Sequence, residues 1–269
     1  MIYVCSDIHG RYEMFMNMLE KINFGDKDRM YIIGDVIDRG PHPIPLLMDI
    51  FERDNITLMI GNHEHMMIQA LLYNDIDEYN DWMFNGGEIT ERQFDILDKN
   101  IQDDILEKLE NCPLIIPNLC VNGKAFYLAH ASHALYPEND VLLYKDAGIQ
   151  NRDRILWDRD YKDIDKKRLT YKYRTLYSQY QGTTLIIGHT PVHRCSYGVV
   201  TSDGYCRISR TRGGHLINID CGCASGITLG CLRLDDMREF YVDRRPIPKT
   251  MRVPFSMRKP AVPHPVLKT

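Results

Sequence analysis

Five apolar runs in this sequence each end in side chains that can bind a metal ion. Ile2–Cys5 is followed by "SDIHG", Met30–Ile33 by "GDVIDRG" and Ile56–Ile60 by "GNHEH". Two later runs, "YLAHAS" and "IIGHTP", end in His130 and His189. One histidine after an apolar run is usually a hydrogen-bonded structural residue. The repetition of the pattern therefore indicates a chemical site rather than packing.

The atoms offered at these positions suit metal ions that bind oxygen and nitrogen. On an extended segment, residues i and i+2 point to the same side, so Asp7 and His9 can bind one ion together. Carboxylate, imidazole and amide ligands without thiolate favour Mn, Fe or Zn. Paired ions roughly 3.5–4 Å apart can clamp a phosphoryl group during an in-line displacement. The strand ends offer more ligands than one structural ion needs: Asp7, His9, Asp35, Asn62, His130 and His189.

The segments that must position these residues alternate between strand and helix. Each of the first three runs precedes a helix-like segment; the first covers about Tyr12 to Ile22, the second Pro43 to Arg53, and the third ends near Tyr73. This β-α order implies a mainly parallel sheet with crossover helices. Ligands of such sheets bind beyond the carboxyl ends of the strands. We therefore expect the three polar turns to meet at one edge.

The rest of the chain changes character twice. Residues 75–111 are polar and helix-prone with a break at 85–87, which predicts a helical insertion. From Pro113 onward, runs such as "AFYLAHAS" and "LGCLRL" predict strands of a second, more antiparallel sheet, with a hairpin turn at Asp203-Gly204. The expected fold is α/β, with two packed mixed β-sheets flanked by helices. The predicted domain covers residues 1–243, and a basic, proline-rich tail covers 244–269.

Composition and charge narrow the range of partners. The chain has 269 residues, 44% of them hydrophobic and 26% charged, which is typical of one globular domain. No apolar run approaches the ~20 residues that cross a bilayer. Residues 244–269 hold seven Lys and Arg and no Asp or Glu, so residues 1–243 carry −11 within a total net charge of −4. The acidity of residues 1–243 argues against nucleic acid as the main partner. The lack of a long apolar run argues against a membrane.

The start of the chain and its cysteines indicate a reducing compartment. Met1–Val4 enters a strand directly, without the basic region and apolar core of a signal peptide. The eight cysteines are scattered, and Cys221 and Cys223 do not match a zinc-finger spacing. We expect free thiols and a cytoplasmic protein. The pattern makes no prediction about the oligomeric state.

In this order, "SDIHG", "GDVIDRG", "GNHE", "AH" and "GHTP" resemble the motifs of the calcineurin-like metallophosphoesterases. Asp-Arg-Gly in the second motif is similar to the phosphoprotein phosphatase branch. "DWMFNGGEIT", "ILWDRD" and "IDCG" resemble segments of the bacteriophage lambda type of protein serine/threonine phosphatase. The resemblance runs from about Ile2 to Leu234, and the basic tail has no counterpart in it.

The resemblance implies a site with two divalent ions, Mn²⁺ first, with Fe and Zn as alternatives. One ion would be bound by Asp7, His9 and Asp35. The second would be bound by Asp35, Asn62, His130 and His189, so that Asp35 bridges the two. A hydroxide between the ions would attack phosphorus.

The resemblance also implies roles for residues beside the ions. Arg39 and Arg159 would bind the phosphate oxygens, because a guanidinium forms a planar fork of donors. Asn85 could line the phosphate pocket, although a loop Asn before two glycines also has a structural reason. His63 would protonate the leaving oxygen, with Asp38 orienting and charging its ring. The neighbouring Glu64 and His65 begin the next helix, and for His65 we expect no more than helix capping and solvation.

The function expected from the resemblance is dimetal-dependent hydrolysis of phosphomonoesters, with phosphoserine or phosphothreonine in proteins as the first substrate class. The first alternative is a symmetrical bis(5'-nucleosyl)-tetraphosphatase, which shares every metal-binding motif quoted above. Other small phosphoesters are a third. An inactive scaffold of the same fold is an alternative of another class, but such chains usually lose a ligand or the acid, and this chain lacks neither.

Overall fold

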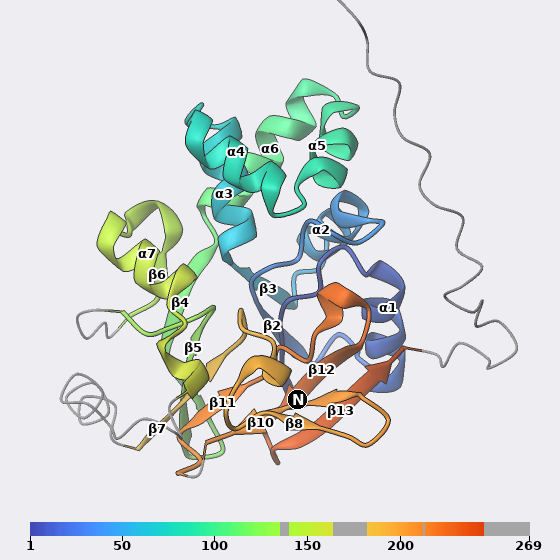
Figure 1. Ribbon diagram of the computed structural model, residues 1–269, viewed down its shortest axis with the longest axis vertical. Coiled ribbons are helices and arrows are strands. Elements are labelled where there is room, and N and C mark those ends of the chain that lie inside the picture. Colours follow the sequence, from blue (N-terminus) through green and yellow to red (C-terminus); the bar gives the residue numbers. More distant parts are fainter. Residues whose placement is uncertain (135–139, 164–181, 212, 245–269) are drawn as a thin grey trace, which may run out of the picture.

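The first seventy residues form three parallel strands joined by helices. The computed structural model describes residues 1–134, 140–163, 182–211 and 213–244 (Figure 1); the predicted tail lies outside these residues except for Arg244. The elements follow the predicted order with ends shifted by at most about two residues: β1 (Ile2–Cys5), α1 (Tyr12–Lys21), β2 (Arg29–Ile33), α2 (Pro43–Phe51), β3 (Ile56–Met59) and α3 (Asn62–Leu71).

The predicted helical insertion consists of three helices that stand above the sheets in Figure 1. They are α4 (Ile76–Phe84), α5 (Glu88–Asp95) and α6 (Lys99–Glu110). Asp75 caps α4 by accepting hydrogen bonds from the backbone N–H groups of Asp77 and Glu78. The break between α4 and α5 lies at Gly86, whose φ of +99° strains any residue with a Cβ.

Two mixed sheets result, as predicted. The first has the order β13-β12-β1-β2-β3, and the second β10-β11-β7-β5-β4-β6. In the first, β1, β2 and β3 are parallel and the other two pairs antiparallel. In the second, β7 pairs in parallel with β5 and β11. The later strands are β4 (Pro113–Val121), β5 (Lys124–Ala129), β6 (Leu142–Leu143), β7 (Thr183–Ile187), β8 (Val199–Val200), β9 (Cys206–Arg207), β10 (Ser209–Arg210), β11 (Leu216–Asn218), β12 (Thr228–Arg233) and β13 (Arg238–Asp243).

One strand assignment was wrong. The run "LGCLRL" was expected in the second sheet, but it forms β12, which pairs antiparallel with β1 in the first sheet. Five of the six residues of β12 are buried, so its apolar pattern fits the centre of either sheet. The hairpin at Asp203-Gly204 is confirmed, because β8 and β9 pair antiparallel around it.

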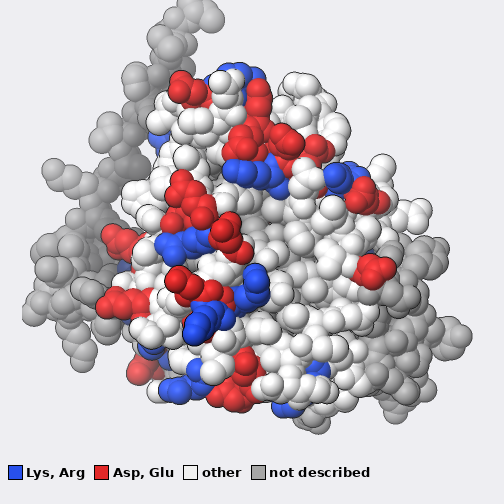
Figure 2. Space-filling view, turned by 180° about the vertical axis from the view of Figure 1, so that it is seen from behind, with Lys and Arg blue, Asp and Glu red and all other residues white. Residues whose placement is uncertain are grey.

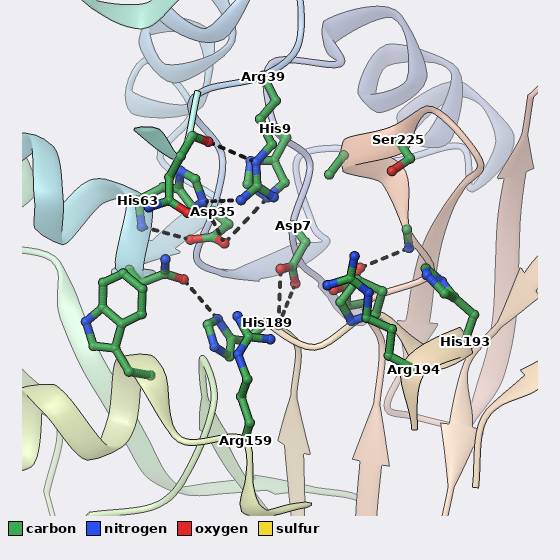
Figure 3. A pocket seen from close by; sticks show the side chains of 17 residues that line it. Asp7, His9, Asp35, Arg39, His63, Arg159, His189, His193, Arg194 and Ser225 are labelled. Atoms are coloured by element: carbon green, nitrogen blue, oxygen red, sulfur yellow. Dashed lines mark hydrogen bonds and ion pairs between the residues drawn. The ribbon is translucent and has the colours of Figure 1, made fainter. Parts of the chain in front are cut away.

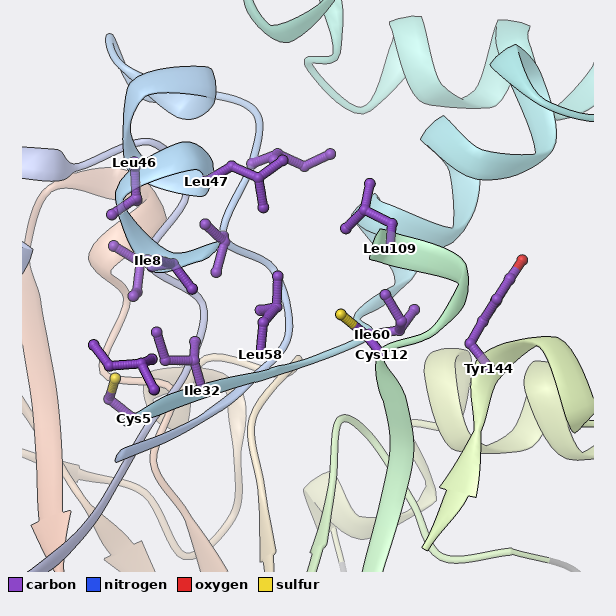
Figure 4. Close-up of a cluster of buried hydrophobic side chains, with 14 of the residues drawn as sticks. Cys5, Ile8, Ile32, Leu46, Leu47, Leu58, Ile60, Leu109, Cys112 and Tyr144 are labelled. Carbon is purple, nitrogen blue, oxygen red and sulfur yellow. The ribbon is translucent and has the colours of Figure 1, made fainter. Parts of the chain in front are cut away.

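The alternation of side chains along β1 shows where the two cores lie. Val4 faces a cluster of residues from both sheets, which fills the space between them. Its neighbours Tyr3 and Cys5 face the opposite cluster, under the helices. Figure 4 shows that second cluster, with Ile32 and Leu58 from the sheet below Leu47 of α2. The strands are thus buried on both faces. A ligand can therefore reach the sheet only at the strand ends, and the polar turns follow their carboxyl ends.

Four short 3-10 turns and one further helix complete the part of the fold that the structure describes. The helix α7 (Ile149–Trp157) lies beside the second sheet in Figure 1. The turns are η1 (Tyr144–Asp146), η2 (Asp160–Asp163), η3 (Val192–Arg194) and η4 (Cys223–Ser225). Among the described residues, no helix is both long and apolar enough to cross a membrane. On the face shown in Figure 2, basic side chains lie beside acidic ones rather than forming a continuous basic surface.

Candidate active site

The polar turns after the strands converge on one pocket of about 300 Å³ (Figure 3). Nine of the eleven residues singled out from the sequence line it: Asp7, His9, Asp35, Arg39, Asn62, His63, Asn85, Arg159 and His189. The other two, Asp38 and His130, are fully buried and contact lining residues from behind. Segments as far apart in sequence as 7 and 189 therefore meet at the edge where the parallel strands end.

The backbone of these turns is strained. Among the described residues other than glycine, ten have a positive φ, and six of them belong to the predicted site. Left-handed conformations cost a residue with a Cβ on the order of 1 kcal/mol each and cluster at functional sites. The six are Asp7 (φ 51°), His9 (48°), Asp35 (56°), Asp38 (70°), Arg39 (62°) and His189 (64°).

Glycines let the turns approach one another. A Cβ on Gly34 would lie 2.5 Å from the backbone of Gly61, and one on Gly61 would lie 2.2 Å from the Asp35 carboxylate. A Cβ on Gly188 would lie 2.2 Å from the carboxylate of Asp7. These contacts are far too short for any larger side chain, so the glycines of "GDVID", "GNHE" and "GHTP" are needed for the carboxylates to reach the pocket.

One group of donor atoms gathers around Asn62. The Nε2 of His130 and the Nδ1 of His189 lie 3.0 and 2.9 Å from the Oδ1 of Asn62, and 3.2 Å from each other. The Nδ1 of His130 lies 2.9 Å from the carbonyl oxygen of Ile33. A carbonyl only accepts, so Nδ1 carries the proton and Nε2 presents a lone pair to the group. Burial lowers the pKa of His130 to about 3, which keeps the ring neutral.

A second group surrounds the other side of Asp35. The Nε2 of His9 lies 3.5 Å from one carboxylate oxygen of Asp35, and the Nε2 of His130 lies 3.4 Å from the other. The Nδ1 of His9 donates to the carbonyl of Ile37 at 2.9 Å, so its lone pair also faces inward. Ligand atoms of His9, Asp35 and His63 lie within 4.8 Å of one another, as do those of Asp35, His130 and His189.

Asp7 approaches from the third side. Its two carboxylate oxygens each accept from the backbone N–H of His189 at 3.1 Å. The pKa of Asp7 is raised well above its usual range, first by burial and then by the charge of Asp220. The pKa of Asp35 is raised in the same way, by burial and then by Asp7. Buried carboxylates that repel one another need a nearby cation to remain ionised.

His63 is held by a buried carboxylate. Its Nδ1 lies 2.5 Å from the Oδ2 of Asp38, which is completely buried. Asp38 also accepts from the indole Nε1 of Trp82 at 3.0 Å and the hydroxyl of Thr90 at 2.5 Å. Burial raises the pKa of Asp38 to about 7, and the bonds from Thr90 and Trp82 oppose that rise. The other ring nitrogen of His63 faces the pocket, so the ring can move a proton there.

The two predicted phosphate-binding arginines enter the pocket from different loops. Arg39 contacts the Nε2 atoms of His9 at 3.0 Å and His63 at 2.8 Å, and its Nε donates to the Asn85 carbonyl at 3.2 Å. Arg159 donates to the hydroxyl of Thr190 at 3.1 Å. The side-chain amide of Asn85 is turned to the carbonyl of Asp81 at 2.8 Å. Asn85 thus holds Arg39 through its backbone rather than presenting its amide.

This geometry agrees with the comparisons with known proteins. The family model for calcineurin-like phosphoesterases matches residues 1–207. The chain belongs to this phosphoesterase family. A relative in Escherichia coli, serine/threonine-protein phosphatase 2, is 32% identical over 162 residues, which cover 59% of this chain and 68% of that protein.

Two other matches define the range of the family. A symmetrical bis(5'-nucleosyl)-tetraphosphatase of Buchnera aphidicola is 40% identical, but over only 68 residues, 24% of this chain and 25% of that protein. A solved structure of a protein serine/threonine phosphatase from Saccharomyces cerevisiae has a TM-score of 0.53 at 17% identity, covering 91% of this chain and 79% of that one. That structure shares the fold. Family membership supports a metal-dependent phosphatase over an inactive scaffold.

The residues fit the divalent metal ions that a calcineurin-like phosphoesterase implies. The lone pair of His130 Nε2 and the amide oxygen of Asn62, both acceptors, face each other at 3.0 Å. The Nδ1 of His189 lies 2.9 Å from that oxygen and 3.2 Å from the Nε2 of His130. Acceptors that face each other repel unless a cation lies between them. On the other side, the guanidinium of Arg39 takes the lone pair of His9, so a cation already fits that position. The donor set is the oxygen and nitrogen mixture that Mn, Fe and Zn accept.

Glu64 is a functional residue that the sequence did not reveal. Its side chain is completely buried and accepts four backbone N–H bonds. One comes from Gly61 at 2.9 Å, and three come from residues 35–37 at 2.8, 2.8 and 3.2 Å. Glu64 thus ties the second polar turn to the third. In the sequence, a carboxylate three residues after Gly61 predicts a capping box. It does not predict the three hydrogen bonds to residues 35–37.

Four further residues were missed or misjudged. His65 is buried and contacts the hydroxyl of Tyr144 at 2.7 Å, so solvation does not explain it. Asp220, in the quoted "IDCG", lines the pocket and is buried; burial raises its pKa to about 6. His193 and Arg194 line the pocket too. Arg194, five residues after the histidine of "GHT", carries no recognisable signal of its own, because in the sequence it resembles any exposed arginine.

Proposed function

We propose that this chain is a phosphoprotein phosphatase that hydrolyses phosphoserine and phosphothreonine. The observation that carries the proposal is the buried Asp38–His63 pair at the pocket. A serine or threonine alkoxide is a strong base and needs a proton to leave. A nucleoside diphosphate or a nitrophenolate is a much weaker base and needs that proton less. A fixed imidazole with a carboxylate behind it therefore suits an alkoxide leaving group.

The metal ligands we propose are those expected from the sequence, and Mn²⁺ is the ion we expect in both sites. Asp7, His9 and Asp35 would hold one ion. Asp35, Asn62, His130 and His189 would hold the other. When bound, such ions polarise phosphoryl oxygens and lower the pKa of water. The chain contributes the fixed positions of these ligands, because their turns are anchored by backbone hydrogen bonds.

The remaining side chains bind and orient the phosphate. Arg39 and Arg159 extend into the pocket from separate loops and can hold phosphoryl oxygens between them. Arg39 now donates to the Nε2 of His63. Transfer of Arg39 to a phosphate would free that nitrogen to take up a proton, which it could then pass to the leaving oxygen. Asp38 keeps the imidazole in the orientation that presents Nε2 to the pocket.

A second candidate is hydrolysis of a dinucleoside tetraphosphate. The observation in its favour is the 40% identity to the Buchnera aphidicola tetraphosphatase, although this covers 24% of the chain against 59% for the phosphatase relative.

A substrate panel on Mn²⁺-loaded protein tests the choice. It comprises phosphoserine and phosphothreonine peptides, diadenosine tetraphosphate, a cyclic nucleotide and p-nitrophenyl phosphate. For each substrate, kcat/KM is divided by kcat/KM for p-nitrophenyl phosphate. We expect this ratio to be highest for the phosphopeptides. A dinucleotide preferred over every peptide would contradict the proposal and favour the second candidate.

A further inference from the structure

The pocket extends beyond the predicted ligands, to the turn that follows His189. That turn is η3, and its last residue, Arg194, lines the pocket together with Arg159 (Figure 3). Neither the metal ligands nor the predicted acid accounts for a third arginine there.

The backbone of this turn is rigid. Val192 is completely buried, and its N–H donates to the carbonyl of Asp220 at 2.9 Å. The N–H of Arg194 donates to the Pro191 carbonyl at 2.8 Å, and that of Cys195 to Val192 at 3.0 Å. A Cβ on Gly198 would lie 1.8 Å from the carbonyl of Val192, so the chain is also packed from the other side. The Cα of Arg194 is therefore held at a fixed distance from the site.

The side chain of Arg194 is less engaged, although its charge lowers the pKa of the buried Asp220 carboxyl in the same pocket. Within the described part of the chain, its guanidinium forms no hydrogen bond or ion pair. Arg39 is bonded to His9, His63 and a carbonyl, and Arg159 to Thr190. An unpaired arginine is common on a surface, but here a rigid turn places it in the wall of a pocket.

Arg194 and Arg159 line the same pocket, so their charges act on each other. The charge of Arg194 lowers the pKa of Arg159, second only to the effect of burial. Two guanidinium groups that share a pocket repel each other, and an anion between or beside them removes the repulsion. The reacting phosphate already has Arg39, Arg159 and the metal site as partners. A further cation is available for a second anionic group.

We propose that Arg194 binds a second anionic group of the substrate, a carboxylate or phosphoryl group next to the phosphate that is hydrolysed. Arg194 is thus a specificity residue that selects substrates with two neighbouring negative charges. The inference rests on the proposed function for the identity of the substrate, since a phosphopeptide would supply the group as an acidic residue beside phosphoserine. A dinucleoside polyphosphate would supply it as the next phosphoryl group.

Paired substrates test this assignment. The first pair is a phosphoserine peptide with Glu next to the phosphoserine and the same peptide with Gln. The second is carboxyphenyl phosphate and phenyl phosphate, and diadenosine tetraphosphate is measured beside them. We expect Arg194→Ala to lower kcat/KM on the order of tenfold for the doubly anionic substrates, the lower end of the effect of losing a charged hydrogen bond. The Gln peptide and phenyl phosphate should change less than about twofold. Arg194→Lys should restore part of the preference, and Arg194→Glu should reverse it.

Arg92→Ala is the matched control, because Arg92 is exposed on α5, outside the pocket; it should leave all ratios unchanged. The inference is overturned if the Arg194→Ala enzyme still prefers the doubly anionic member of each pair. It is also overturned if kcat/KM falls equally for both members of a pair. Failure of the proposed function is distinguishable from this. If the wild type hydrolyses no phosphopeptide but the aryl pair and the dinucleotide depend on Arg194, the second-anion assignment stands and the phosphoryl group is its source.

Discussion

Replacing His63 with Asn should separate the two kinds of leaving group. The Nδ1 of His63 lies 2.5 Å from the buried carboxylate of Asp38. Its Nε2 faces the pocket, where it contacts Arg39 at 2.8 Å and lies 4.0 Å from an oxygen of Asp35. If it is the general acid, His63→Asn should lower turnover of a phosphoserine peptide on the order of 10²–10⁴-fold. The loss on p-nitrophenyl phosphate should be clearly smaller, because nitrophenolate leaves without a proton.

The surroundings of Asp38 set the size of a second, smaller effect. Asp38→Asn removes a charged hydrogen bond to the imidazole, worth about 1.5–3 kcal/mol. That free energy corresponds to roughly a 10- to 100-fold loss on the peptide. In His63→Asn, by contrast, Asp38 keeps its bonds from Trp82 and Thr90, so the protein should fold and its metal content should be unchanged.

The assay is steady-state turnover of both substrates, with bound metal measured for each variant. His42→Asn is the control, because His42 is exposed and lies outside the pocket; it should match the wild type on both substrates. Equal losses on the two substrates with metal retained would refute the acid role and make His63 a phosphate-binding group. Equal losses with metal lost would make it a ligand.

Four further predictions concern the ligands, the phosphate, the turns and the tail. Chelated protein should be inactive and recover with Mn²⁺, and Asp35→Asn should lose most activity because Asp35 lies between both ligand groups; full activity after chelation would refute the two-ion site. Arg159→Ala should weaken inhibition by inorganic phosphate, with partial rescue by Lys; unchanged inhibition would remove Arg159 from the site. Glu64→Gln should lower the free energy of unfolding, measured in urea, by about 3 kcal/mol, because buried N–H donors lose a charged acceptor. An unchanged urea midpoint would mean that Glu64 does not hold the turns together. Removal of residues 245–269 should leave aryl phosphatase activity intact; loss of metal binding would show that the tail belongs to the fold.

Local information was enough to predict the first half of the fold. The runs before "SDIHG", "GDVIDRG" and "GNHEH" are apolar, short and each followed by a helical period, so strand, turn and helix were all visible in the sequence. The pairing of β12 with β1 was not, because a run that is buried on both faces carries no information about which sheet it joins. The identity of candidate ligands was readable for the same local reason, since residue type and position after a strand are properties of single segments.

What holds the candidate site together is a set of contacts between segments, and these leave no local pattern. The N–H groups of Asp7 and His9 donate to the carbonyls of Gly34 and Asp35 at 3.0 and 2.9 Å, which continues the pairing of β1 and β2 into the two polar turns. Glu64 then joins the second turn to the third. The left-handed conformations of the site are tolerated because these bonds over-determine the backbone. The turns therefore present their carboxylates and imidazoles in a preorganised arrangement that owes its geometry to the chain itself.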